Sequence, residues 1–166
     1  MNIDMTRINR LTIELQMVKS RMEELRKEYR VTAQSYFNEF VKQFFDELPE
    51  VQTIRWLQYT PYFQDGDTCH FSVHGIYFSN AKPDQLDVSG YTVEDSNPVL
   101  WSTEGYKYND DLIEGRPYLN YMEKPMRAFT EMVNSISDIL PDIFGEHVQV
   151  TITREGIQIE DYSDHD

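Results

Sequence analysis

The first 48 residues carry a pattern of apolar positions that is typical of a long helix. Apolar residues recur at alternating spacings of three and four, as in the a and d positions of a heptad repeat. These positions are Ile8, Leu11, Leu15, Val18, Met22, Leu25 and Tyr29. Glycine and proline are absent until Pro49, so no residue here interrupts a helix. The pattern predicts a long N-terminal helix whose first part carries a coiled-coil-like seam.

The apolar stripe becomes broader and more aromatic in the second part of the predicted helix. Its members are Ala33, Tyr36, Phe37, Phe40, Val41, Phe44 and Leu48. A wide stripe is typical of a helix that packs on a globular core, whereas a narrow seam is typical of helix pairing. We therefore divide the chain into a coiled-coil-like helical extension, residues 1–32, and an acidic α+β domain, residues 33–166.

The seam has two interpretations, and the charged residues beside it bear on both. It either pairs with another helix, that of a second copy (a homo-oligomer, most simply a dimer) or that of a partner protein, or it folds back on its own domain. In a parallel pair Glu14 faces Lys19, which is favourable, but Arg21 faces Arg26, which is not. In an antiparallel pair Glu14 lies near Arg21 instead. Pairing with another helix is the preferred interpretation, and for two copies the charges favour antiparallel helices slightly.

After Pro49 the apolar period shifts from that of a helix toward that of a strand. Two alternating runs, 53–59 and 69–78, are joined by a segment with a turn at Asp65-Gly66. Two further runs, 147–153 and 156–162, surround Arg154-Glu155 and predict a second hairpin. The fold class expected is α+β, with an antiparallel sheet of two hairpins and a second helix packed on one face.

The second helix is predicted between the two hairpins. One face carries Met126, Phe129, Val133, Ile136 and Leu140. Pro125 lies near its expected start and Pro141 closes it. The segment 79–116 before it is rich in turn-forming residues and has only short strand candidates, at 90–93 and 99–102.

Charge is distributed unevenly along the chain. Residues 1–48 carry eight basic and eight acidic residues, and residues 49–166 carry seven basic and twenty-one acidic residues. The formal net charge of −14 therefore belongs entirely to the second part. Such a surface repels phosphate backbones, so direct nucleic-acid binding by it is not expected.

Acidic and aromatic residues alternate in the irregular segment, which suggests a surface that binds a protein with a basic face. The candidate partner-binding residues are Glu94, Asp95, Trp101, Glu104, Tyr106, Tyr108, Asp110 and Asp111. In the competing interpretation, the acidity serves solubility alone.

Known catalytic signatures are absent from the sequence. It has no glycine-rich phosphate loop, no G-x-S-x-G, no H-E-x-x-H and no C-x-x-C motif. His70 and His74, with Cys69 beside them, lack an evident third and fourth metal ligand. We therefore expect no enzyme activity, no cofactor and no metal. A hydrolase that holds a metal with acidic pairs such as Asp110-Asp111 is kept as a weaker alternative.

The single cysteine, Cys69, has no partner within the chain, which favours a reducing compartment. No apolar run approaches the roughly 18–20 residues that cross a bilayer. We therefore expect a cytoplasmic protein without membrane contact.

The run Trp56-Leu57-Gln58-Tyr59-Thr60-Pro61-Tyr62-Phe63-Gln64-Asp65-Gly66-Asp67-Thr68-Cys69-His70-Phe71-Ser72-Val73 resembles a block found in uncharacterised proteins of tailed bacteriophages and some bacteria. In those proteins a long N-terminal helix precedes a similar block. The resemblance covers about a tenth of the chain and implies a bacterial host cell as the setting. It implies no activity and transfers no functional residues.

These observations lead to three functional hypotheses. The first is a non-enzymatic phage-type accessory protein that binds and modulates a host macromolecule, such as a nucleic-acid enzyme or a defence protein, through its acidic, aromatic surface. The second is a structural or assembly protein that oligomerises through its N-terminal helix. The third is the metal-assisted hydrolase.

Overall fold

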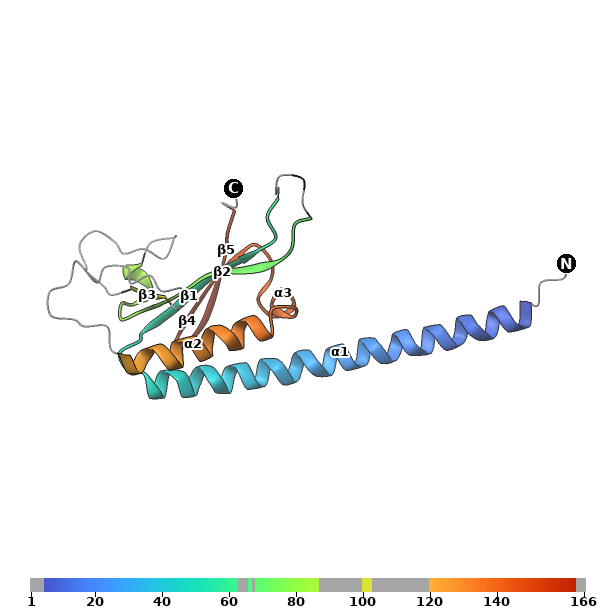
Figure 1. Ribbon diagram of the computed structural model, residues 1–166, viewed down its shortest axis with the longest axis horizontal. Coiled ribbons are helices and arrows are strands. Elements are labelled where there is room, and N and C mark those ends of the chain that lie inside the picture. The colour runs from blue at the N-terminus through green and yellow to red at the C-terminus, as the bar shows by residue number, and fades with distance from the viewer. Residues whose placement is uncertain (1–4, 63–65, 67, 87–99, 103–119, 164–166) are drawn as a thin grey trace. The chain divides into compact units, whose positions relative to one another are not determined.

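The structure, a computed structural model, describes residues 5–62, 66, 68–86, 100–102 and 120–163 of the 166-residue chain, with the backbone alone at 100–102 and 120–123. Its elements are α1 (Met5–Glu47), β1 (Thr53–Tyr59), β2 (Ser72–Ser79), the 3-10 turn η1 (Pro83–Gln85), β3 (Leu100–Ser102), α2 (Asn120–Ser135), α3 (Leu140–Phe144), β4 (Val148–Thr153) and β5 (Gly156–Asp161). The α+β class expected from the sequence is confirmed (Figure 1). The chain forms two compact units, Met1–Tyr36 and Phe37–Asp166.

Helix α1 runs without interruption for 43 residues, as the absence of glycine and proline predicts. It ends at Glu47, just before Leu48, whose backbone N–H donates to the carbonyl of Phe44 at 2.9 Å. Pro49 follows directly and has no N–H with which to continue the helix. From Phe37 onward the apolar stripe is buried, and Phe37 itself has no exposed surface. This burial confirms that the stripe from Phe37 onward belongs to a core, whereas Tyr36, which the sequence placed in the same stripe, is 61% exposed.

All strand pairs in the sheet are antiparallel, in the order β3-β2-β1-β4-β5. The strand predicted at 53–59 is confirmed as β1, which is the central strand. The run expected at 69–78 forms a strand only from Ser72. The second predicted hairpin is confirmed as β4 and β5, and Arg154 and Glu155 form its turn. The two hairpins therefore join side by side through β1 and β4.

The register between β1 and β2 shifts at Trp56, where one residue of β1 faces two residues of β2, Gly75 and Ile76. This arrangement is a β-bulge. Gly75 has a φ of +53°, which residues with a side chain rarely adopt. A Cβ atom at this position would lie 2.7 Å from the ring of Tyr77. The positive φ therefore favours glycine at the bulge, and a side chain there would also displace the end of the Tyr77 side chain.

Within the second unit, α2 and the last turns of α1 cover one face of the sheet (Figure 1). Aromatic rings fill the space between the helices and the sheet. Phe44 lies 5.1 Å from Phe129 of α2 and 5.5 Å from Phe78 of β2, measured between ring centroids. Phe37 meets Trp56 edge-on at 6.5 Å. Contacts of this kind combine burial of large apolar surfaces with favourable ring geometry.

A buried glutamine connects the central strand to α3. Gln58 has no exposed surface, and its amide nitrogen donates to the carbonyls of Gly145 at 2.6 Å and Leu140 at 3.3 Å. Its amide oxygen accepts a hydrogen bond from the indole nitrogen of Trp56 at 3.0 Å. Buried polar groups are costly unless they are paired, and here the side chain of Gln58 has partners at both ends.

The end of the second helix differs from the expectation. Helix α2 stops at Ser135, whereas the sequence predicted that it would continue to Pro141. The residues after Ser135 form successive turns instead. In these turns the backbone N–H of Ile136 donates to the carbonyl of Val133, and the N–H of Ile139 donates to the carbonyl of Ile136. Pro141 lies in the first turn of α3, where its missing N–H breaks no helical hydrogen bond. Proline therefore starts a new short helix here.

Candidate interaction surfaces

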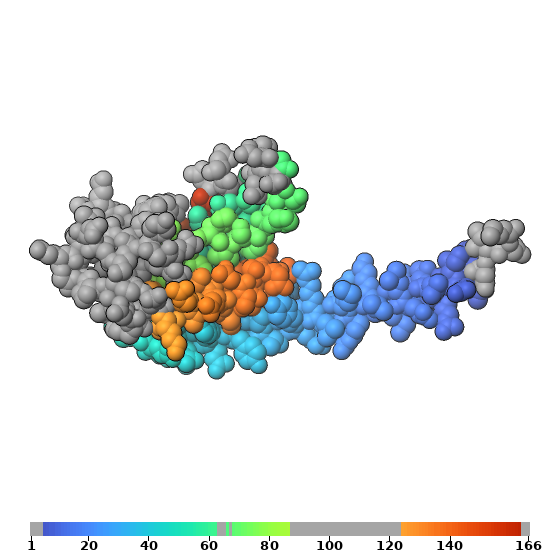
Figure 2. Space-filling model, in the orientation of Figure 1, coloured from blue at the N-terminus to red at the C-terminus, as the bar shows by residue number. Residues whose placement is uncertain are grey.

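The heptad seam is an exposed apolar surface on α1. We use this name for Ile8, Leu11, Leu15, Val18, Met22, Leu25 and Tyr29, which are all helical. Their side chains are between 42% and 69% exposed. Figure 2 shows this part of α1 in blue, with side chains projecting along the helix. Scattered exposed apolar residues are ordinary, but a regular row of seven on one helix is typical of a binding surface.

Two ion pairs on α1 involve charged residues that flank the seam. Arg10 Nε lies 2.9 Å from Glu14 Oε1, and Arg21 Nη1 lies 3.1 Å from Glu24 Oε2. All four side chains are more than half exposed. Exposed pairs within one helix contribute only about 0.3–0.5 kcal/mol each. Glu14 and Arg21 therefore exchange these partners for others at little cost.

Most of the predicted acidic, aromatic surface lies outside the described residues. This applies to Glu94, Asp95, Glu104, Tyr106, Tyr108, Asp110 and Asp111. Trp101 belongs to β3, where its backbone pairs with Phe78. The binding role of this set remains a prediction.

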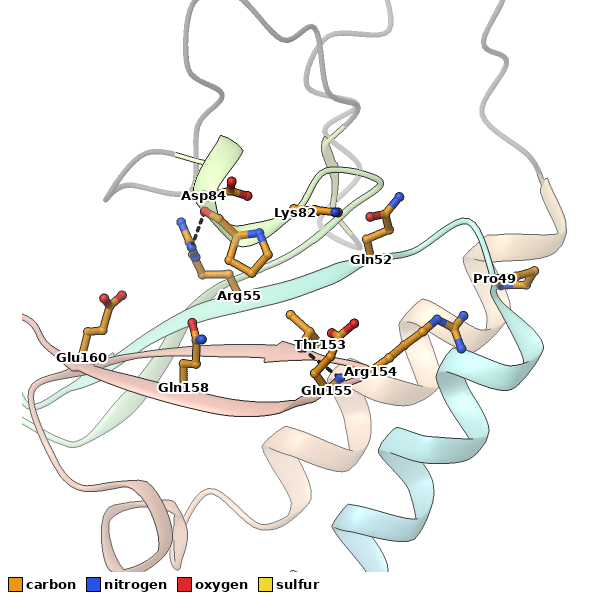
Figure 3. A pocket seen from close by; sticks show the side chains of 11 residues that line it. Pro49, Gln52, Arg55, Lys82, Asp84, Thr153, Arg154, Glu155, Gln158 and Glu160 are labelled. Atoms are coloured by element: carbon orange, nitrogen blue, oxygen red, sulfur yellow. Dashed lines mark hydrogen bonds between the residues drawn. The ribbon is translucent and has the colours of Figure 1, made fainter.

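A polar pocket of about 640 Å³ lies on the face of the sheet opposite α1 and α2, between η1 and β5 (Figure 3). We call it the open-face pocket. Three basic residues line it, Arg55, Lys82 and Arg154, and three acidic residues, Asp84, Glu155 and Glu160. Because the positive and negative residues are equal in number, their electrostatic fields largely cancel, and the pocket has no strong preference for an anion.

Arg55 has a structural role in this pocket. It is only 6% exposed, and its Nε donates to Thr151 Oγ1 at 3.1 Å. Its Nη2 donates to the carbonyl of Pro83 at 3.3 Å, the bond drawn in Figure 3. Thr53 adds a hydrogen bond of 2.6 Å from its hydroxyl to the carbonyl of Ala81. These bonds fix the segment that contains η1 against the sheet.

Arg154 also has partners outside the pocket. In Figure 3 its side chain extends toward α1. There Nη2 donates to the carbonyl of Phe45, Nη1 lies 3.9 Å from Asp46, and the guanidinium lies 5.3 Å from the centre of the Phe45 ring. The last carbonyls of a helix lack partners within it and carry partial negative charge. Arg154 therefore caps the C-terminal end of α1.

Glu155 keeps its charge at the turn between β4 and β5. A hydrogen bond from the Thr153 side chain lowers the pKa of Glu155, and the positive charges of Lys82 and Arg154 act in the same direction. This fully exposed carboxylate is therefore ionised at neutral pH.

An apolar groove of about 430 Å³ lies on the other face of the sheet, beside the last strand. Val41 and Phe45 of α1 form one side, and Ile152 and Ile157 form the floor. Ile157 is 37% exposed, and Ile159, two residues further along β5, is 47% exposed. We call this feature the edge groove. The sequence predicted strand 156–162 but not that its apolar side chains lie exposed beside α1; the alternation of Ile157 and Ile159 was the available signal.

The histidines considered as metal ligands do not form a cluster in the part of the chain that the structure describes, where no three potential ligand residues gather. His74 stacks on Tyr59 with 4.1 Å between ring centroids, and its Nε2 lies 3.1 Å from Ser72 Oγ. Burial lowers the pKa of His74, although a backbone hydrogen bond at Tyr59 acts in the opposite direction. Its contacts are those of a packed side chain.

No helix among the described residues has an apolar stretch long enough to cross a membrane. No protein-family model, curated protein or solved structure matches this chain.

Proposed function

We propose that this chain is a non-catalytic assembly protein in which the first part of α1 pairs with the same helix of a second copy. The observation that carries the proposal is the exposure of the heptad seam, 42% or more at each of its seven positions. Seams of this kind bury their a and d side chains against a facing helix.

The free energies of burial and of association favour a dimer that forms reversibly. Two seams contribute fourteen side chains, seven from each copy. Burying the exposed half of each contributes about 1 kcal/mol, so the total is on the order of 14 kcal/mol. Association costs roughly 4–15 kcal/mol in lost translational and rotational freedom. The balance supports a dimer that forms and separates with concentration.

The charges beside the seam support a second copy as the partner. In an antiparallel pair, Glu14 of each copy approaches Arg21 of the other, whereas a parallel pair brings Arg21 and Arg26 together. The present partners of Glu14 and Arg21 lie on their own helix and are exposed, so exchanging them costs little. Self-complementary charge is what a two-fold symmetric interface needs.

Light scattering over a dilution series tests this proposal. We expect the mass of a dimer at high concentration and a decline toward that of a monomer on dilution. A monomer mass at every concentration would remove the proposal.

The acidity of residues 49–166, with twenty-one acidic and seven basic residues, favours a second candidate function. In it, the acidic surface binds a protein with a basic face, and opposed charges steer the encounter. Neutralising Glu94, Asp95, Asp110 and Asp111 to their amides should then weaken capture of that partner from a bacterial lysate and leave the melting temperature nearly unchanged. If the wild-type protein and the four-site variant capture the partner equally well, the acidity serves solubility only.

A further inference from the structure

Strand β5 is an edge of the sheet. It pairs with β4 and has no second neighbour among the described strands, and each of its residues from Gly156 to Asp161 is exposed. An edge strand presents a row of backbone groups that are able to pair with another chain.

The alternation of hydrogen bonds between β4 and β5 identifies which backbone groups of β5 point away from β4. The N–H of Tyr162 donates to the carbonyl of His147 at 2.8 Å, so this pair is a hydrogen-bonded one. Hydrogen-bonded and non-hydrogen-bonded pairs alternate along an antiparallel ladder. The backbone hydrogen bonds between β5 and β4 are therefore made by three pairs, 149↔160, 151↔158 and 153↔156. Ile157, Ile159 and Asp161 direct their N–H and C=O groups outward.

A strand added along β5 would meet different surroundings on its two faces. On the helix side its side chains would lie beside Ile157 and Ile159 and reach the edge groove, which is apolar. On the opposite side they would lie beside Gln158 and Glu160, at the border of the open-face pocket. Because side chains alternate along a strand, apolar and polar residues at alternate positions suit the two faces.

Charge disfavours a second copy in the register that sets Ile157 opposite Ile159. The charged residues of β5 and of the turn position before it are all acidic: Glu155, Glu160 and Asp161. An antiparallel β5–β5 pair that sets Ile157 opposite Ile159 would also set Glu155 opposite Asp161. Like charges directly opposite each other destabilise a strand pair. Glu160 lies on the same side of β5 as Gln158, and it is the carboxylate that a basic side chain of an added strand would meet.

We propose that β5 binds an extended segment of another protein by strand addition, and that this segment alternates apolar residues with basic ones. Its apolar side chains enter the edge groove and its basic side chains face Glu160. Strand addition at β5 involves neither the heptad seam nor the acidic segment at 94–111, so its test is independent of both.

A six-residue peptide that alternates isoleucine and lysine, with blocked ends and a fluorescent label, is the probe, since β5 has six residues. We expect it to bind the full-length protein and to slow hydrogen exchange at the amides of Ile157 and Ile159. The control peptide has the same sequence with methylated amides at alternate positions, so it lacks one row of donors. It should bind about tenfold more weakly or worse, because it loses several backbone hydrogen bonds.

Two substitutions on the protein complete the test. Ile159→Pro removes an outward N–H without breaking a bond to β4, since proline is tolerated on edge strands. Ile159→Ala shortens the same side chain but keeps the N–H. We expect Ile159→Pro to weaken binding about tenfold beyond Ile159→Ala. Equal binding by these two variants, equal binding of the methylated peptide, or unchanged exchange at Ile157 and Ile159 with ~1 mM peptide would overturn the proposal.

Discussion

At the scale of single residues, Gln58 shows how one polar side chain holds parts of the second unit together. It is completely buried and joins Trp56 in β1 to the carbonyls of Leu140 and Gly145. The run 56–73 contains this glutamine, so at least this part of the run has a structural role. A polar residue in a strand-like sequence gave no sign that it would be buried.

Gln58→Leu should lower the free energy of unfolding by about 2–4 kcal/mol, because the indole N–H and a carbonyl lose their partner and each unpaired buried group costs about 1–3 kcal/mol. Gln52→Leu, at an exposed position just before β1, is the matched control and should change stability by less than about 0.5 kcal/mol. Urea denaturation of the three proteins measures the difference. A change at Gln58 as small as the control would show that the network contributes little.

His74 should make stability depend on pH. Burial lowers its pKa in the folded protein below the ordinary value of 6.5, so the unfolded chain binds more protons over the interval just below 6.5. Stability therefore rises with pH through this interval and falls as the solution becomes more acidic. His74→Phe keeps a ring against Tyr59 but does not titrate. Melting temperatures measured across this interval should show a smaller dependence on pH for the variant, and parallel curves would contradict the assignment.

At the scale of elements, the apolar periods predicted most of the fold. The heptad and broad stripes of α1, strand β1 and the hairpin of β4 and β5 were all predicted from spacing alone. The end of α2 was not, because Ile136 and Leu140 continue the helical spacing although the backbone turns at Ser135. Ile136 and Leu140 are buried as their spacing predicts, but in turns and in α3 rather than in a continuous helix.

The charges that flank the seam predict the orientation of paired helices. In an antiparallel pair Arg21→Gln removes an attraction to Glu14 and should weaken the dimer, whereas in a parallel pair it relieves repulsion from Arg26 and should strengthen it. The pair interaction occurs twice by symmetry, so the expected loss is about 0.4–1 kcal/mol. Sedimentation equilibrium at low salt measures the dissociation constant. A tighter dimer would rule out the antiparallel arrangement.

At the scale of the whole molecule, the sequence predicted the candidate surfaces less completely than the fold. The heptad seam was predicted residue by residue and lies exposed on α1, since its spacing is a local property. The edge groove and the open-face pocket were not predicted, because Val41 and Ile157, or Arg55 and Glu160, come together only once strand order is known. Charge totals indicated an acidic protein but not that Arg55 and Arg154 have structural partners.

The proposed pairing of two copies through the heptad seam is tested by placing a charge on the seam. Leu15→Asp puts a carboxylate at an apolar interface, where losing its hydration costs several kcal/mol. Gln16→Asp introduces the same group one residue away, off the seam, and serves as the control. Multi-angle light scattering should give a monomer for Leu15→Asp and a dimer for the control, with near-ultraviolet circular dichroism of the folded domain unchanged in both. Equal masses for the two variants, or loss of the folded signal in Leu15→Asp alone, would contradict pairing through the seam.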